Sequence, residues 1–140
     1  MKKVLCTLAF VSSVSLAFGA LAGSDTKVGK VGDPLPQKLA DYELTGDVKK
    51  CFKSTSIKTS RPLDDYHILF TMRNGDKYLN RLSNRCAGLR FNGTYSYTNF
   101  EPRLCHLEIL RVVDTSAAGG FRGSCGLGKF EKIQKVASSE

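Results

Sequence analysis

The sequence is short of the residue patterns that carry most enzyme chemistry. It has only two histidines, His67 and His106. No nucleophile elbow, paired Glu-x-His or His-x-x-x-His spacing accompanies them. Internal repeats and long helical periodicity are missing as well. These patterns do not decide whether the protein is an enzyme, but they favour a protein without catalytic activity.

Cysteine pairs of the zinc-knuckle kind are also missing. The four cysteines after the first 22 residues are far apart in the chain, at Cys51, Cys86, Cys105 and Cys125. Their even number indicates two disulfides in an exported protein, and we expect neither a metal nor a cofactor. Three connectivities are possible. We favour Cys86–Cys105 with Cys51–Cys125, because the first and last strands of a closed barrel meet.

The chain begins like a secretory signal peptide. Lys2 and Lys3 precede an apolar stretch that is too short for a stable membrane anchor. Ala20-Leu21-Ala22 then supplies a small-x-small cleavage signal. We therefore expect cleavage after Ala22 and a periplasmic or secreted protein whose mature chain has no membrane span.

The rest of the chain is long enough for one domain with a real core. Residues 23–40 are rich in Gly, Pro and charge, which predicts a flexible leader. Residues 41–140 are predicted to form a single β domain. Lys and Arg number 21 against 13 acidic residues, so the whole chain has a formal charge of +8 that favours acidic partners.

The clearest secondary-structure signal is a hairpin. Residues 66–72 alternate, with Ile68, Phe70 and Met72 on the apolar face, and Asn74-Gly75-Asp76 makes a turn. A three-residue loop with a glycine bulge is favoured over a two-residue loop, because it turns Tyr78 and Leu82 inward, opposite Met72 and Ile68.

That register also sets the direction in which two polar side chains point. Asn80 points inward, opposite Phe70, and Arg81 points outward. A buried amide needs partners, so Asn80 is expected to hold a loop carbonyl or amide, with a place in a pocket as the alternative.

Further strands are predicted at residues 94–100, 104–114 and 128–133, with a flexible loop at 117–128. The inward face of 104–114 changes near Ile109–Leu110, which suggests a β-bulge. The predicted fold is all-β, a small curved barrel or sandwich of five to six antiparallel strands with two disulfides.

A glycine-rich segment resembles part of a nucleotide-binding loop. Gly123 is followed after four residues by Gly128-Lys129, but Phe130 stands where Ser or Thr must hold magnesium. No nucleotide partner is expected.

The histidine with the best catalytic context is His67, which follows Asp64 and Asp65. A carboxylate could orient the imidazole for general-base work, so a hydrolase is one alternative. Alternation along the strands places both histidines at the surface or rim, which favours the non-catalytic interpretation.

A group of basic and polar residues provides the leading hypothesis of function. The group comprises Lys77, Asn80, Arg81, Arg85 and Arg90. Such residues among aromatic strands can bind polyanions, although an exported protein meets little nucleic acid. We predict a non-enzymatic binding or structural module for an anionic envelope component or a protein partner. An inhibitor or accessory protein of a cell-wall enzyme is a further alternative, by analogy of fold.

The chain also resembles a family of small exported bacterial proteins described only as a domain of unknown function. The shared pattern runs through Cys51; Tyr78, Asn80 and Leu82; Cys86, Gly88 and Leu89; Leu104 and Cys105; and Cys125, Leu127, Gly128 and Phe130. It covers about residues 47–133. The resemblance implies an exported single domain and transfers no activity or catalytic residue.

Overall fold

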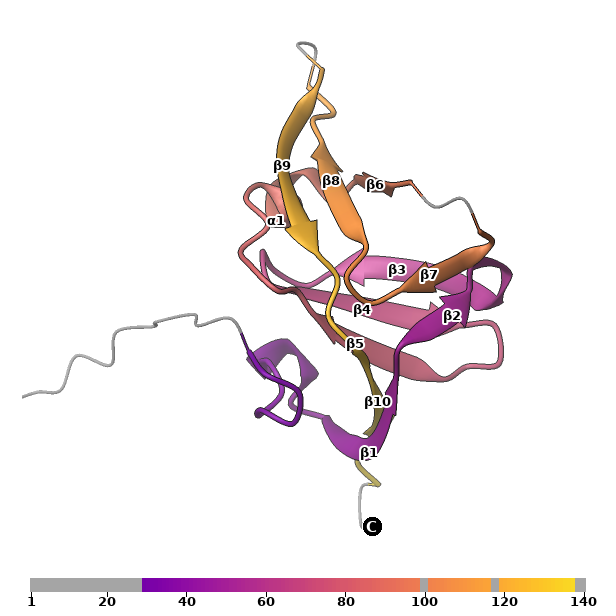
Figure 1. Cartoon of the computed structure of the whole chain (residues 1–140). Helices are drawn as coiled ribbons and strands as arrows, with labels where there is room; N and C mark the ends of the chain where they lie inside the picture. The colour runs from indigo at the N-terminus through magenta and orange to yellow at the C-terminus, as the bar shows by residue number, and fades with distance from the viewer. Residues whose placement is uncertain (1–28, 99–100, 117–118, 138–140) are drawn as a thin grey trace, which may run out of the picture.

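The computed structural model describes residues 29–98, 101–116 and 119–137 (Figure 1). The predicted signal peptide and the first part of the predicted leader lie outside the described residues. In chain order the elements are η1 (Gln37–Leu39), β1 (Tyr42–Lys49), β2 (Cys51–Lys53), η2 (Ser54–Ser56), β3 (Ile57–Pro62), β4 (His67–Met72), β5 (Lys77–Arg81), α1 (Leu89–Asn92), β6 (Tyr95–Tyr97), β7 (Arg103–Cys105), β8 (Ile109–Val113), β9 (Phe121–Gly126) and β10 (Phe130–Lys135).

The strands form three antiparallel sheets, which confirms the all-β prediction. One sheet has the order β1-β10-β5-β4-β3, a second pairs β2 with β7, and a third has the order β6-β8-β9. Only Lys50 separates β1 from β2, and residues 127–129 join β9 to β10. These two segments bend from one sheet into the next, which divides the chain into more strands than the predicted five to six.

The disulfides confirm the predicted number and correct the predicted pairing. Cys51 bonds to Cys105, and Cys86 bonds to Cys125. The first and last strands do meet, as β1 pairs with β10. However, Cys51 lies in β2, beyond the bend, where Cys105 of β7 is its cross-strand partner. The closed-barrel argument therefore placed Cys51 on the wrong strand.

The predicted hairpin exists with the predicted faces and a shifted register. Phe70 pairs with Tyr78 and Ile68 with Asn80. The loop is Arg73-Asn74-Gly75, because Met72 donates its N–H to Asp76 O at 2.8 Å and Gly75 has φ of 92°. The loop has the predicted length but begins one residue earlier. Cross-strand partners therefore shift by two residues, which leaves Tyr78, Asn80 and Leu82 inside.

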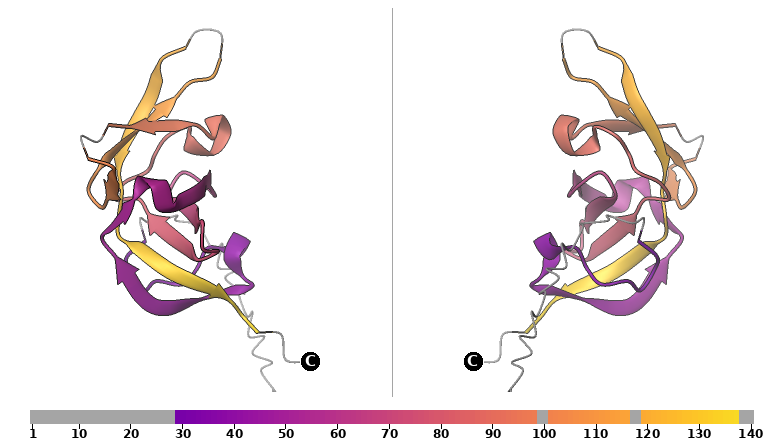
Figure 2. Two further views of the ribbon diagram at one scale, coloured as in Figure 1. Left: turned by 90° about the vertical axis from the view of Figure 1, so that its right-hand side faces the viewer. Right: turned by 90° about the vertical axis from the view of Figure 1, so that its left-hand side faces the viewer.

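Two hydrophobic clusters cover opposite faces of the five-stranded sheet. The larger fills the space between the sheets and includes Phe52, Ile68, Phe70, Met72, Tyr78, Leu82, Leu89, Leu104, Leu110, Val112, Leu127 and Phe130. The smaller, on the other face, joins Leu79 and Ile133 to Leu39 of η1 and Leu63. Figure 2 shows the segment from residue 29 to η1 folded beside this second face.

Residues 29–40 are therefore part of the fold, where the sequence led us to expect a flexible leader. Leu39 is buried, and the side chain of Lys38 donates to the carbonyl oxygen of Leu63. Composition suggested flexibility, but every second residue of a strand faces the far side of the sheet. That side needs a cover, and this segment supplies it.

Two further expectations from the sequence were wrong. Residues 104–114 form two strands, β7 and β8, because a turn at residues 106–108 separates them where a bulge was expected. Leu107 in that turn has φ of 71°. The predicted flexible loop at 117–128 contains strand β9, which pairs with β8.

Among the described residues, no helix is long and apolar enough to cross a membrane.

Candidate functional site

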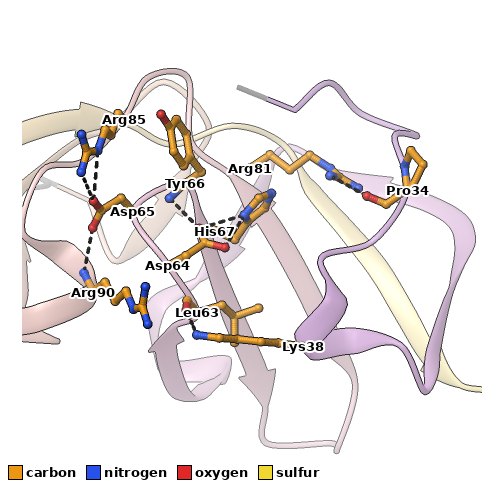
Figure 3. Close-up of polar contacts among 10 residues, drawn as sticks. All are labelled: Pro34, Lys38, Leu63, Asp64, Asp65, Tyr66, His67, Arg81, Arg85 and Arg90. Atoms are coloured by element: carbon orange, nitrogen blue, oxygen red, sulfur yellow. Dashed lines mark hydrogen bonds and ion pairs between the residues drawn. The ribbon is translucent and has the colours of Figure 1, made fainter. Parts of the chain in front are cut away.

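Arg81, the centre of the predicted basic group, is occupied inside the protein. Its Nε donates to Glu131 Oε2 at 2.6 Å, and both side chains are buried. Its Nη2 donates to the carbonyl oxygen of Asp33 at 2.5 Å. Its Nη1 donates to the carbonyl oxygen of Pro34 at 3.3 Å, as Figure 3 shows. The other oxygen of Glu131 accepts from Gly32 N at 2.6 Å. The ion pair thus fastens the N-terminal segment to the sheet.

Asn80 and Lys77 also have internal roles. Asn80 Nδ2 donates to Gly128 O at 2.7 Å, and Asn80 Oδ1 accepts from Gly128 N at 3.0 Å. These two hydrogen bonds to the backbone of a loop are what we expected of a buried Asn80. Lys77 Nζ donates to the Tyr42 hydroxyl at 2.5 Å and lies 4.8 Å from the centroid of that ring.

Arg85 and Arg90 are exposed, but they share a carboxylate. Arg85 donates from Nε and Nη2 to Asp65 Oδ2 at 3.1 and 3.0 Å, and Arg90 donates its backbone N–H to Asp65 Oδ1 at 3.1 Å. Figure 3 shows Asp65 between these two arginines, apart from Arg81. The five predicted residues therefore do not converge on one surface.

His67 does have a carboxylate partner, and the partner is Asp64. His67 Nδ1 lies 2.9 Å from both oxygens of Asp64, which also accepts from Tyr66 N at 2.7 Å. Burial alone raises the pKa of Asp64, but the hydrogen bonds from His67 and Tyr66 outweigh burial and hold that pKa below its usual value. Asp65 does not contact His67 in this way, because its carboxylate accepts hydrogen bonds from the Arg85 side chain and from the backbone N–H of Arg90.

The surroundings of this pair are structural. His67 is buried, although we expected it at the surface or rim, and its carbonyl oxygen accepts from Leu63 N at 2.8 Å. It does not line the hollows at Lys49, Tyr97 or Asn84 in the described part of the chain. The pair therefore braces the turn before β4.

The hollow with the most suitable chemistry lies where β1 and β2 face the β4–β5 turn. It is a cleft of about 390 Å³ lined by Lys49, Phe52, Ser56, Met72, Arg73, Asn74, Asp76 and Tyr78. Phe52, Met72 and Tyr78 make its apolar floor and belong to the main core. The Phe52 and Tyr78 rings meet edge to face, with centroids 4.7 Å apart.

Lys49 is held over this floor. Its Nζ lies 5.5 Å from the centroid of the Tyr78 ring and 5.9 Å from that of Phe52, within the range of a cation–π contact. A hydrogen bond with the Tyr78 side chain, aided by the charge interaction with that group, raises the pKa of Lys49. The ammonium group therefore remains charged.

Arg73 supplies a second cation at the rim. Its Nε donates to Thr55 O at 2.7 Å, and its backbone N–H donates to Ser56 O at 2.9 Å. These two bonds fix the arginine beside η2. The side chain is exposed and forms no ion pair with any residue in the described ranges.

The only carboxylate among the cleft residues is already neutralised. Asp76 accepts from Lys132 Nζ at 3.2 Å and from Asn74 Nδ2 at 3.1 Å. The hydrogen bond from Lys132 is the main reason that the pKa of Asp76 is lowered, so Asp76 stays ionised and paired. Lys49 and Arg73 consequently leave the cleft with an excess of positive charge.

Sequence reasoning missed this cleft, although it singled out the Asn74-Gly75-Asp76 turn. Lys49 and Arg73 are far apart in the chain, and the bend after β1 brings them to one cleft.

The described residues contain no cluster of three or more His, Cys, Asp or Glu that could hold a metal ion. Comparisons with protein families, curated proteins and solved structures find no match.

Proposed function

We propose that the protein is a non-enzymatic binding module that takes the anionic group of a ligand into the cleft between Lys49 and Arg73. The observation that carries this proposal is the charge of the cleft, in which Lys49 stands over the apolar floor and Arg73 lies at the rim, while Asp76 is paired with Lys132. A cleft of this size and mixed lining suits a ligand with one charged and one apolar portion.

The ligand class follows from the expected location. An exported protein with two disulfides meets the anionic components of the cell envelope, which carry phosphate or carboxylate groups. Arg73 can donate two parallel N–H bonds to such a group, while Lys49 acts as a point charge. An acidic protein segment is the other partner of this chemistry.

A hydrolase is less well supported. His67 is buried and its partner Asp64 is partly exposed, and the pair braces a turn and does not line the hollows at Lys49, Tyr97 or Asn84. No observation favours an inhibitor of a cell-wall enzyme over a general binding module. The binding module therefore remains the function that the geometry supports best.

Cosedimentation with lipid vesicles tests the proposal. The exported, disulfide-bonded protein should bind vesicles that contain phosphatidylglycerol, should bind purified lipopolysaccharide, and should ignore vesicles of phosphatidylcholine alone. Binding should weaken by about tenfold or more between 50 and 200 mM salt if several charges are neutralised, an order-of-magnitude expectation. Equal binding to neutral and anionic vesicles, or binding that salt does not change, would contradict the proposal.

A further inference from the structure

The first described residues are attached to the five-stranded sheet through their main chain. Within the described ranges, every hydrogen bond that leaves residues 29–34 ends on Arg81 or Glu131. Arg81 donates from Nη2 and Nη1 to the last two carbonyl oxygens of the segment, at 2.5 and 3.3 Å (Figure 3). Glu131 Oε1 accepts from Gly32 N at 2.6 Å. No side chain of the segment takes part in these bonds.

Arg81 and Glu131, which we call the main-chain clamp, need an occupant. Their side chains are 4% and 3% exposed, and the bond between Arg81 Nε and Glu131 Oε2 leaves three polar atoms of the pair for other partners. Buried ionised groups without hydrogen-bond partners cost free energy, so an empty clamp is unfavourable. Within one chain, residues 32–34 satisfy all three atoms. A second segment with the same main-chain geometry satisfies them equally well.

The segment that fills the clamp brings its own shape. Asp33 N donates to Lys30 O at 3.1 Å, and Lys30 N donates to Asp33 Oδ2 at 2.6 Å, so the turn is closed within the segment. Val31 is 49% exposed, and Gly32 and Pro34 are exposed as well. A copy of this segment therefore carries the same turn to any clamp that it meets.

Residues 35–40 form the apolar half of the same attachment. Leu35 packs against the smaller hydrophobic cluster and Leu39 is buried in it. The side chain of Lys38 donates to Leu63 O, and within the described chain no backbone hydrogen bond joins residues 35–40 to the sheet. The first such bond comes at the next residue, Asp41, whose carbonyl oxygen accepts from Val136 N at 2.8 Å. Residues 29–40 thus lie on the sheet as a separate cover (Figure 2).

We propose that residues 29–40 exchange between copies of the protein, so that the segment of one copy occupies the main-chain clamp of another. The occupant is a second copy of the chain, because the structure shows this same segment seated in the site. The exchanged pair remakes every contact of the closed chain, so exchange costs little beyond the entropy of association. Reciprocal exchange gives a two-fold dimer. The exchange involves no residue of the Lys49–Arg73 cleft.

Two complementary variants test the exchange. Gly32→Pro disables the segment, because proline has no N–H for Glu131 and cannot adopt the φ of 88° found at Gly32. Arg81→Met/Glu131→Leu removes the clamp and leaves the segment unchanged. Each variant alone should sediment as a monomer. An equimolar mixture at several hundred micromolar should contain a one-to-one complex, in which the intact segment of the second protein fills the intact clamp of the first.

The matched control is the triple variant Gly32→Pro/Arg81→Met/Glu131→Leu, which has neither half of the site. Its dissociation constant with the Gly32→Pro protein should be larger by about tenfold or more, because it offers no segment that fits the clamp. A complementary mixture that stays monomeric overturns the exchange. A control mixture that associates equally well overturns the assignment to the clamp.

A peptide of residues 29–41 provides a test that does not depend on the folding of any variant. The wild-type protein should bind this labelled peptide in a fluorescence anisotropy titration, although its own segment competes and lowers the apparent affinity. The same peptide with the Gly32→Pro change should bind about tenfold or more weakly. Equal binding of the two peptides, or binding of neither, overturns the proposal. Lys49 and Arg73 are unchanged in all these proteins, so none of these results bears on the anionic cleft.

Discussion

Lys49 Nζ stands 5.5 Å above the centre of the Tyr78 ring, although 28 residues of chain separate the two. The bend between β1 and β2 creates this contact, since it turns the end of β1 over the hairpin. The aromatic ring stabilises the ammonium group, and neighbouring protein carboxylates do not cancel both cations of the cleft. A cation placed in this way remains available to an anion.

The disulfide pairing can be read directly. Peptide mapping of the unreduced protein should find Cys51 linked to Cys105 and Cys86 linked to Cys125. Cys86 and Cys125 are buried, whereas Cys51 and Cys105 are half-buried. Mild reductant followed by alkylation should therefore label Cys51 and Cys105 first. Peptides that join Cys86 to Cys105 would contradict the structure.

Replacing Arg81 should release the N-terminal segment. In Arg81→Met the buried Glu131 loses its cation, and such a change costs about 3–5 kcal/mol of the free energy of unfolding. The double variant Arg81→Met/Glu131→Leu should recover much of this loss, because no unpaired charge remains. Urea unfolding measures both variants, and a double variant no more stable than Arg81→Met would contradict the account.

Gly128 should tolerate no side chain. A Cβ atom at this position would overlap the carbonyl oxygen of Arg81, which is backbone and cannot rotate away. Gly128→Ala should therefore destabilise the fold by about 3 kcal/mol or more, on the scale of severe overpacking. Gly46→Ala is a comparison in open space, although Gly46 has positive φ and carries its own smaller strain. Thermal unfolding of the two variants compares their stabilities, and Gly128→Ala should lose more stability than Gly46→Ala.

Acid should weaken the β8–β9 hairpin through Asp114. Hydrogen bonds from Ser116, aided by Arg122, lower the pKa of Asp114 from 3.8 to about 2. A pKa that is lower in the folded state gives stability that is present above pH 3.8 and is lost as the pH falls toward 2. The unfolding free energy of Asp114→Asn should depend less on pH across this window than that of the wild type. Parallel slopes for the two proteins would contradict this role of Asp114.

Local patterns were enough to predict the hairpin and the role of Asn80. Alternation fixed which residues face the core, and a register error of two residues preserves the face. The burial of Asn80 then required a partner, which the structure supplies at Gly128. These predictions depend on side chains that are close in the sequence.

The remaining features depend on contacts that no local pattern contains. Arg81 looked exposed because the hairpin alone cannot show that residues 32–34 cover it. The disulfide pairing failed because it depends on the bend at Lys50. The cleft was missed for the same reason, since Lys49 and Arg73 become neighbours only after that bend.

The most direct test of the cleft compares two double variants that remove the same charges. Lys49→Gln/Arg73→Gln changes the cleft, and Lys58→Gln/Arg61→Gln changes exposed residues of β3 outside it. Affinity for phosphatidylglycerol vesicles should fall by about tenfold or more in the first variant, because each charged hydrogen bond contributes about 1.5–3 kcal/mol, and should change much less in the second. Equal losses in the two variants would show that binding depends on net charge alone, and would contradict the assignment of the site.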